Sequence, residues 1–265
     1  MLSSMPVQPS HGQHTHAPAN ARWRATQVRS WSIDGCALRG IATFLLFVFA
    51  SAASAQLSVT VSAVSDYRYR GITLSDQKPA VQVGGTYDDP LGWYAGAFGS
   101  TVRLAPPAGP NVQAIAFAGY ALRLTSGVSL EVGGDYSAFT GASGDNYGEF
   151  FVGAATDKLS ARVYYSPKYF GQQANAVYGE INASLPLIDR VRFLAHIGLL
   201  RTSYPAIYGQ QSEQHVVDGR IGLGVDVDLF HLELAWVGTS AAYAAYQITG
   251  SKSPNTVVLS LSRSF

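Results

Sequence analysis

Asp66, Arg68 and Arg70 alternate along a short stretch of the chain, a spacing that would put all three side chains on one face of a β-strand. A guanidinium group is always charged and offers its donors in a planar fork that suits carboxylates and phosphates. The two arginines could therefore attract anions at the mouth of a channel. Alternatively, they pair with Asp66, Asp76 or a neighbouring strand and only hold a loop in place, as loop ion pairs commonly do.

Further charged residues occupy the polar faces of alternating segments farther along the chain. If those faces surround an enclosed lumen, facing acids and bases could orient dipolar or zwitterionic solutes in a constriction. The alternative is that these charges cross-link the walls and leave little passage. The predicted lumen charges are Glu131, Asp135, Glu149, Arg162, Glu180, Arg192, Asp218, Arg220 and Glu233.

The histidines offer little for catalysis. His196, His215 and His231 are the three that follow residue 55, and none has a serine-rich nucleophile signature nearby. The sequence has no G-x-S-x-G, H-E-x-x-H or phosphate-loop motif, although a Ser/His pair assembled across strands would not be visible. We therefore expect no enzymatic activity, no cofactor and no metal ion, with a lipid hydrolase of the outer membrane as the less favoured alternative.

The first 55 residues have the anatomy of a cleaved export signal. The apolar run 41–50 is too short to span a bilayer, follows a basic residue and precedes the small residues 53–55, which suit signal peptidase. We predict cleavage after Ala55 and a mature chain, 56–265, that lacks Cys36, the only cysteine. The part before the apolar run is long for such a signal, so initiation at Val28 is a further hypothesis.

After residue 55, apolar and polar residues alternate in segments of about ten residues separated by turn-forming residues. In the clearest segment, Val217, Ile221 and Leu223 share one face, and Asp218 and Arg220 share the other. We predict twelve strands at 56–67, 79–88, 92–103, 112–124, 127–139, 147–156, 159–167, 175–185, 190–202, 214–227, 230–240 and 255–265.

The predicted connections alternate between short turns and longer loops, the latter including 203–213 and 241–254. Over an even number of strands, this alternation predicts an all-β fold: one transmembrane antiparallel up-and-down β-barrel of about 12 strands, with both termini on the periplasmic side. A soluble sandwich or barrel is the alternative. It would carry charge on roughly a quarter of its residues, whereas here the fraction is 13%. The low and nearly balanced charge also argues against a nucleic-acid partner.

Aromatic residues near the predicted strand ends favour a membrane barrel, because such rings settle at the two lipid–water interfaces. The chain ends on Phe265 after outward-facing Val257, Leu259 and Leu261, as in the C-terminal signal that the outer-membrane barrel assembly machinery recognises. At the short-turn end we expect Tyr87, Trp93, Phe193, Phe230 and Phe265, and at the loop end Tyr67, Phe139, Tyr147, Tyr165, Tyr204 and Tyr243.

The segment 65–76, Ser-Asp-Tyr-Arg-Tyr-Arg-Gly-Ile-Thr-Leu-Ser-Asp, is followed by Pro-Ala-Val-Gln at 79–82 and Gly-Trp-Tyr-Ala-Gly at 92–96. This stretch of about forty residues resembles the opening of the mature chain in the TorF-type family of outer-membrane porins. The resemblance implies an outer-membrane barrel for passive passage of small solutes, and it carries no residue roles over by position.

Together, these features predict a narrow channel in the bacterial outer membrane for small hydrophilic solutes. Lumen charge and width would set its selectivity. The expected partners are outer-membrane lipid, the barrel assembly machinery and the solutes themselves. The alternative is a barrel that conducts nothing and serves as an anchor or receptor through its loops.

Overall fold

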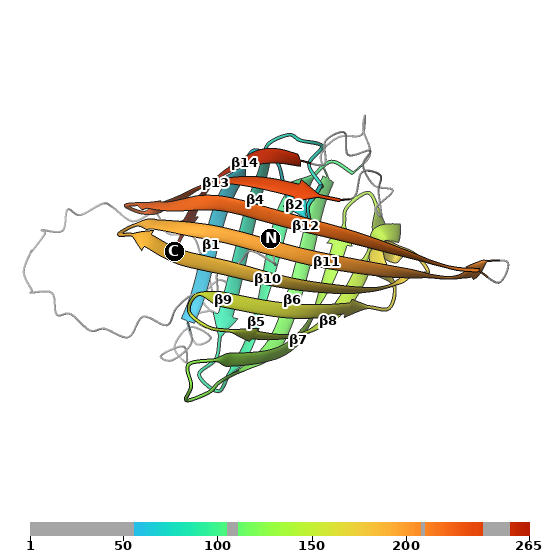
Figure 1. The fold of residues 1–265 in the computed structure, drawn as a ribbon, viewed down its shortest axis with the longest axis horizontal. Coiled ribbons are helices and arrows are strands. Elements are labelled where there is room, and N and C mark those ends of the chain that lie inside the picture. The colour runs from blue at the N-terminus through green and yellow to red at the C-terminus, as the bar shows by residue number, and fades with distance from the viewer. Residues whose placement is uncertain (1–55, 105–110, 208–209, 241–254) are drawn as a thin grey trace, which may run out of the picture. The chain divides into compact units, whose positions relative to one another are not determined.

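The computed structural model describes residues 56–104, 111–207, 210–240 and 255–265. Twelve strands of this part of the chain form a closed antiparallel barrel, in which β1 and β14 complete the ring (Figure 1). The predicted fold class is therefore confirmed. The barrel strands are β1 (Gln56–Val64), β4 (Ala80–Asp88), β5 (Trp93–Val102), β6 (Asn111–Arg123), β7 (Ser129–Phe139), β8 (Tyr147–Ala155), β9 (Leu159–Ser166), β10 (Asn175–Ile188), β11 (Val191–Ile207), β12 (Gln210–Val227), β13 (Phe230–Thr239) and β14 (Asn255–Ser264).

Two kinds of small element lie in the loops that the structure describes. The short strands β2 (Arg68–Tyr69) and β3 (Ile72–Thr73) pair with each other within the first loop. Two single-turn 3-10 helices, η2 (Ser143–Asp145) and η3 (Tyr169–Gly171), lie in later loops. Among the described residues, no helix has the length and apolar character needed to cross a membrane.

The outward face of the barrel is apolar, as the alternation predicts. On β12, Val217, Ile221 and Leu223 are 44–55% exposed, while Asp218 between them is buried. Each of the twelve barrel strands has at least one large apolar side chain exposed in this way. Together they form a broad apolar surface around the barrel. Lipid solvates such a surface, whereas water would make it an aggregation site. The fold is that of an outer-membrane β-barrel.

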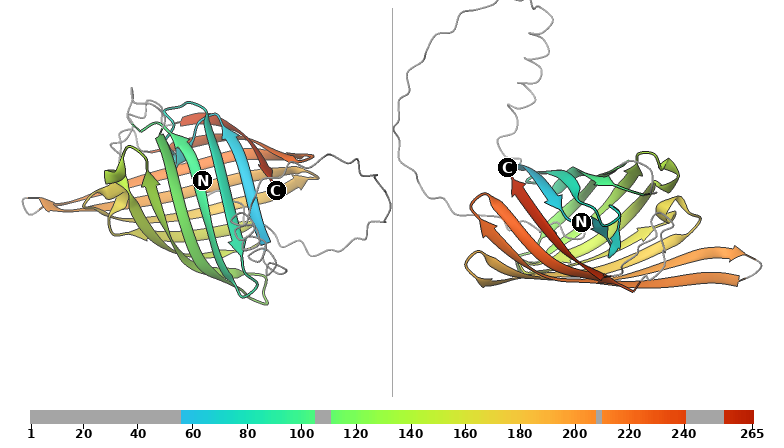
Figure 2. Two further views of the ribbon diagram at one scale, coloured as in Figure 1. Left: turned by 180° about the vertical axis from the view of Figure 1, so that it is seen from behind. Right: turned by 90° about the horizontal axis from the view of Figure 1, so that it is seen from above.

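The strands β11 and β12 continue past the barrel rim as a projecting hairpin (Figures 1 and 2). Their pairing runs on to Ile207 and Gln210, whereas β10 ends opposite Ser203. The prediction of a loop at 203–213 is therefore wrong for most of that segment. The ladder shifts register between Tyr204 and Ile207, where Pro205 cannot donate a main-chain hydrogen bond.

The aromatic belts are only partly as predicted. At the short-turn end, Tyr87, Trp93, Phe230 and Phe265 are 44–66% exposed. At the loop end, however, three of the predicted belt residues point into the barrel, where they are almost fully buried. They are buried because they pack into a cluster of side chains inside this end of the barrel, so they do not face lipid. The three are Tyr67, Phe139 and Tyr147, whereas Tyr165 is exposed and Tyr243 lies outside the described residues.

Phe265 completes the closure between the first and last strands. Its N–H donates to Val59 O at 2.8 Å, and Val59 N–H donates back to Phe265 O at 3.3 Å. The adjacent Arg263 guanidinium lies 4.6 Å from the centre of the Phe265 ring. The last residue thus adds both main-chain bonds and an exposed apolar ring to this edge.

We expect deletion of Phe265 to lower the amount of assembled barrel in outer membranes, because it removes these two bonds and the terminal aromatic side chain. The measurement is the heat-shifted gel mobility of membrane-extracted protein. Phe265→Leu is the matched control, since it keeps the main-chain bonds and an apolar end, and it should assemble better than the deletion. Normal levels of folded protein after the deletion would contradict the assembly role.

Candidate functional site

The first loop, residues 65–79, folds into the barrel rather than away from it. Arg70 and Gly71 both have positive φ angles, 50° and 79°, and form the two-residue turn between β2 and β3. A Cβ on Gly71 would lie 2.7 Å from Asp218 Cβ and 2.8 Å from Thr239 Cβ on the wall. Only glycine therefore fits at the tip of this loop, which touches β12 and β13.

The base of the loop holds an ion pair of its own. Arg68 Nε donates to Asp66 Oδ2 at 2.8 Å, and both side chains are about 95% buried or more. Asp66 Oδ1 accepts a further bond from Thr73 Oγ1 at 2.5 Å. From the sequence, Arg68 had two alternatives, an anion site and a pairing with Asp66. The structure shows the pairing with Asp66.

Arg70 instead reaches across the lumen to β8. Its Nη1 and Nη2 donate to the two carboxylate oxygens of Glu149 at 3.0 and 2.6 Å, and Nη1 also donates to Tyr169 Oη at 2.9 Å. Both charged side chains are about 3% exposed. Burial acts to lower the pKa of Arg70, but the Glu149 carboxylate and nearby tyrosines raise it well above its ordinary value, so Arg70 stays charged.

Tyrosine rings surround the Arg70 guanidinium. Its central carbon lies 4.2 Å from the ring centre of Tyr178, 5.2 Å from that of Tyr164 and 5.4 Å from that of Tyr169. Tyr69, from the loop itself, is 4.9 Å away. These distances are within the range of cation–π attraction, which strengthens where water is excluded. Arg70 is therefore held by one carboxylate and by the aromatic rings around it.

A second loop adds aromatic packing at the same end of the barrel. Phe170 has a φ of 48° and stacks on Phe139 with ring centres 5.6 Å apart. Its ring also lies 4.6 Å from that of Tyr147, whose hydroxyl donates to Tyr69 Oη at 3.1 Å. The two loops thus pack together into one aromatic cluster that fills the loop end of the barrel in this conformation.

Below this cluster, the barrel wall carries ion pairs that join strands. Arg162 Nε on β9 donates to Glu131 Oε1 on β7 at 2.5 Å, spanning the intervening β8. Gly153 of β8 makes room for this pair, because a Cβ there would lie 2.5 Å from Glu131 Oε1. Arg220 and Glu233 pair between β12 and β13. Glycine thus allows side chains to meet across a strand of the wall.

His196 belongs to a polar cluster on β10, β11 and β12. One ring nitrogen lies 2.8 Å from Asp218 Oδ1, and the other lies 2.7 Å from Asn182 Oδ1. Tyr178 Oη also donates to Asp218 at 3.1 Å. These three neighbours are not serine, threonine or cysteine, the residues that usually serve as hydroxyl or thiol nucleophiles.

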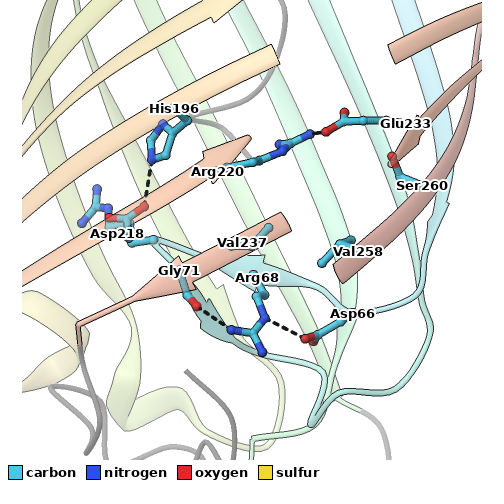
Figure 3. A pocket seen from close by; sticks show the side chains of 11 residues that line it. Asp66, Arg68, Gly71, His196, Asp218, Arg220, Glu233, Val237, Val258 and Ser260 are labelled. Carbon is cyan, nitrogen blue, oxygen red and sulfur yellow. Dashed lines mark hydrogen bonds and ion pairs between the residues drawn. The ribbon is translucent and has the colours of Figure 1, made fainter. Parts of the chain in front are cut away.

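A small cavity of about 60 Å³ separates the first loop from the wall (Figure 3). It contains charges of both signs, since the Arg68–Asp66 and Arg220–Glu233 pairs both border it. A polar space of this size holds several water molecules. The figure shows the remaining labelled lining residues, which are Gly71, His196, Asp218, Val237, Val258 and Ser260.

All nine predicted lumen charges lie on inward faces, buried or half-buried. Ion pairs of these charges join strands of the wall. Arg192 pairs with Asp226 at 2.8 Å near the short turns, and Asp135 lies opposite Glu149 in register. In the described parts of the chain, no three His, Cys, Asp or Glu side chains gather as they would to hold a metal ion.

The tyrosines around Arg70 were not predicted as site residues. A usable signal existed, because Tyr164 and Tyr178 stand two residues from Arg162 and Glu180 and therefore share their inward face. The contact of both rings with Arg70 could not be predicted from the sequence, because the guanidinium comes from a loop far away along the chain.

We expect Glu149→Gln to release the first loop, because it leaves the buried Arg70 charge without its partner. The loss of a charge-assisted pair corresponds to roughly a tenfold or larger increase in loop opening. The measurement is the rate of tryptic cleavage after Arg70 in the folded protein. Glu131→Gln, which removes a wall ion pair instead, is the matched control, and equal cleavage rates in the two variants would contradict this role of Glu149.

Three solved structures show a limited similarity to this chain. The KdgM porin is 11% identical, with 78% of this chain and 99% of that chain covered and a TM-score of 0.49. The NanC porin is 12% identical, with the same coverages and the same TM-score. LpxR from Salmonella typhimurium is 9% identical, with 78% and 99% covered and a TM-score of 0.38.

No curated protein sequence gives a significant match. A family of bacterial proteins of unknown function, Gcw_chp, matches residues 49–265. The match covers all twelve strands of the barrel and the first loop with its Arg70 contacts. The chain is therefore a member of the Gcw_chp family of bacterial proteins.

Proposed function

We propose that this protein is an outer-membrane channel for passive diffusion of small hydrophilic solutes, closed at its loop end by residues 65–79 in the conformation described. The single observation that carries this proposal is the contrast between the two faces of the barrel. Its outside is apolar, whereas charges of both signs line its inside down to the short-turn end. An apolar outer face with a charged inner face is the arrangement that a water-filled pore through lipid requires.

Export to the outer membrane is part of the same proposal, with a signal cleaved after Ala55 and the barrel inserted by the assembly machinery. The short turns and both ends of the barrel sequence would then face the periplasm. The TorF-type porin assignment also belongs here. The segment 65–76, which resembles the opening of that family, is the one that folds into the lumen, and this supports a role in passage.

A non-conducting barrel is the second candidate function. It is favoured by the aromatic cluster, in which Tyr67, Phe139, Tyr147 and Phe170 are at most 3% exposed at the loop end. If this cluster never opens, the barrel carries no solute and serves as an anchor or receptor. The two candidates differ in whether the first loop can leave the lumen.

The deciding experiment compares single-channel conductance in planar bilayers for the wild-type protein and for a variant in which a short Gly-Ser turn replaces residues 66–77. We expect small or rare openings in the wild type and a several-fold larger conductance in the variant, because the loop no longer fills the lumen. Heat-shifted gel mobility shows that both proteins are folded. A folded variant that passes no current would overturn the channel and support the anchor or receptor.

We further expect the double substitution Arg68→Ala and Arg70→Ala to shift ion selectivity toward cations, because it removes two positive charges beside Asp66 and Glu149. The measurement is the reversal potential under a salt gradient. Arg201→Ala, whose side chain is exposed on β11 and paired with Glu213 rather than with a lumen residue, is the matched control and should leave the potential unchanged. If the double variant also keeps the wild-type potential, lumen charge at this place does not govern selectivity.

A further inference from the structure

We propose that the four residues which hold Arg70 from outside the first loop form a binding site for a small organic cation that bears a guanidinium group. We call Glu149, Tyr164, Tyr169 and Tyr178 the cation cage. Arg70 would occupy this cage as a tethered ligand that a solute can displace. The inference rests on the proposed channel function for its role in passage, but binding to the cage does not require conduction.

The cage has the geometry of a guanidinium site. Glu149 accepts two parallel hydrogen bonds from Arg70, at 3.0 and 2.6 Å, and Tyr178 covers the planar cation at 4.2 Å. Tyr169 adds a hydroxyl acceptor at 2.9 Å. A carboxylate that accepts two hydrogen bonds, with aromatic rings near the cation, suits a planar fork of donors better than a compact ammonium ion.

Two further carboxyl groups lie near the cage. Asp135 stands directly opposite Glu149 on the neighbouring strand. Glu180 is 4% exposed, and its Oε1 accepts hydrogen bonds from Tyr164 Oη at 3.5 Å and Asn182 Nδ2 at 3.4 Å. Its other oxygen, Oε2, is buried without a hydrogen-bond partner among the described residues. Buried carboxyl groups need a cation or donors, so a cationic solute with N–H donors would find an acceptor beside the cage.

The residues of the cage come from the barrel wall and from the loop that contains η3, whereas Arg70, which occupies the cage, comes from the first loop. Glu149, Tyr164 and Tyr178 are fixed on the adjacent strands β8, β9 and β10, and Tyr169 lies in η3. The first loop keeps its Arg68–Asp66 pair internal, so it can leave without exposing that pair's charges separately. Departure of the loop would then empty the cage while leaving Glu149, Tyr164 and Tyr178 in position on their strands.

The test measures binding of ethylguanidinium, at millimolar concentrations, to folded protein in detergent by titration calorimetry. We expect Arg70→Ala to bind at least about tenfold more tightly than the wild type, because the tethered competitor is gone. Arg201→Ala, which removes an exposed arginine that pairs with Glu213, should bind like the wild type. Adding Glu149→Gln to Arg70→Ala should abolish the gain, and acetate should not bind.

A second measurement uses the wild-type protein. It distinguishes a natural ligand site from a cavity that the Arg70→Ala substitution itself creates, and it can be made even if Arg70→Ala does not fold. Ethylguanidinium should increase tryptic cleavage after Arg70 several-fold, because it displaces the loop, while the same concentration of sodium chloride should not. Unchanged wild-type cleavage would overturn the proposal even if Arg70→Ala binds the probe, and so would a folded Arg70→Ala protein that binds no more tightly than Arg201→Ala.

Conductance measured without ethylguanidinium tests the channel separately from the cation site. A folded Arg70→Ala protein that conducts but does not bind ethylguanidinium would support the channel and overturn the cation site. A folded protein that binds ethylguanidinium tightly but passes no current would overturn the channel and support the cation site, and the cage would then be the ligand site of a receptor.

Discussion

The buried ion pair between Arg70 and Glu149 is the interaction on which the arrangement of the lumen depends. A charge taken out of water is costly unless a partner and further hydrogen bonds compensate it. Here the partner carboxylate, one tyrosine hydroxyl and several aromatic rings all converge on the same guanidinium. That single contact links the first loop to the opposite side of the barrel, and the aromatic residues of both loops pack around it. The loop end of the lumen is thus filled by two loops that meet at this ion pair.

The barrel itself could be predicted from the sequence because the two-residue period is a local signal. Strand β12, for example, places Val217 and Ile221 on its lipid-facing side and Asp218 on its lumen side. A shift of the pairing by one residue would turn Asp218 toward lipid, so the alternation fixes the register of the strand. The boundaries failed mainly at 203–213. There β11 and β12 pair only with each other, so nothing in the surrounding barrel marks where they end.

The site was less predictable, for a physical reason. Sequence spacing correctly placed Arg68 and Arg70 on a common segment and allowed for pairing with Asp66, but it could not say that the segment turns inward. Tyr67, Phe139 and Tyr147 show the same limit, since an aromatic residue at a strand end suits a lipid interface and a buried cluster equally well. Which of the two it occupies depends on contacts between loops that are distant in sequence.

The projecting β11–β12 hairpin has a consequence for how the molecule meets its surroundings. Because it stands beyond the other strands, its two outer edges have no neighbouring strand among the described residues. Strand edges in such a position invite pairing with another chain. Pro205, which has no main-chain donor, and the charged Glu213 both discourage this. Since the barrel closes without these residues, the hairpin can change its sequence while the lumen stays intact.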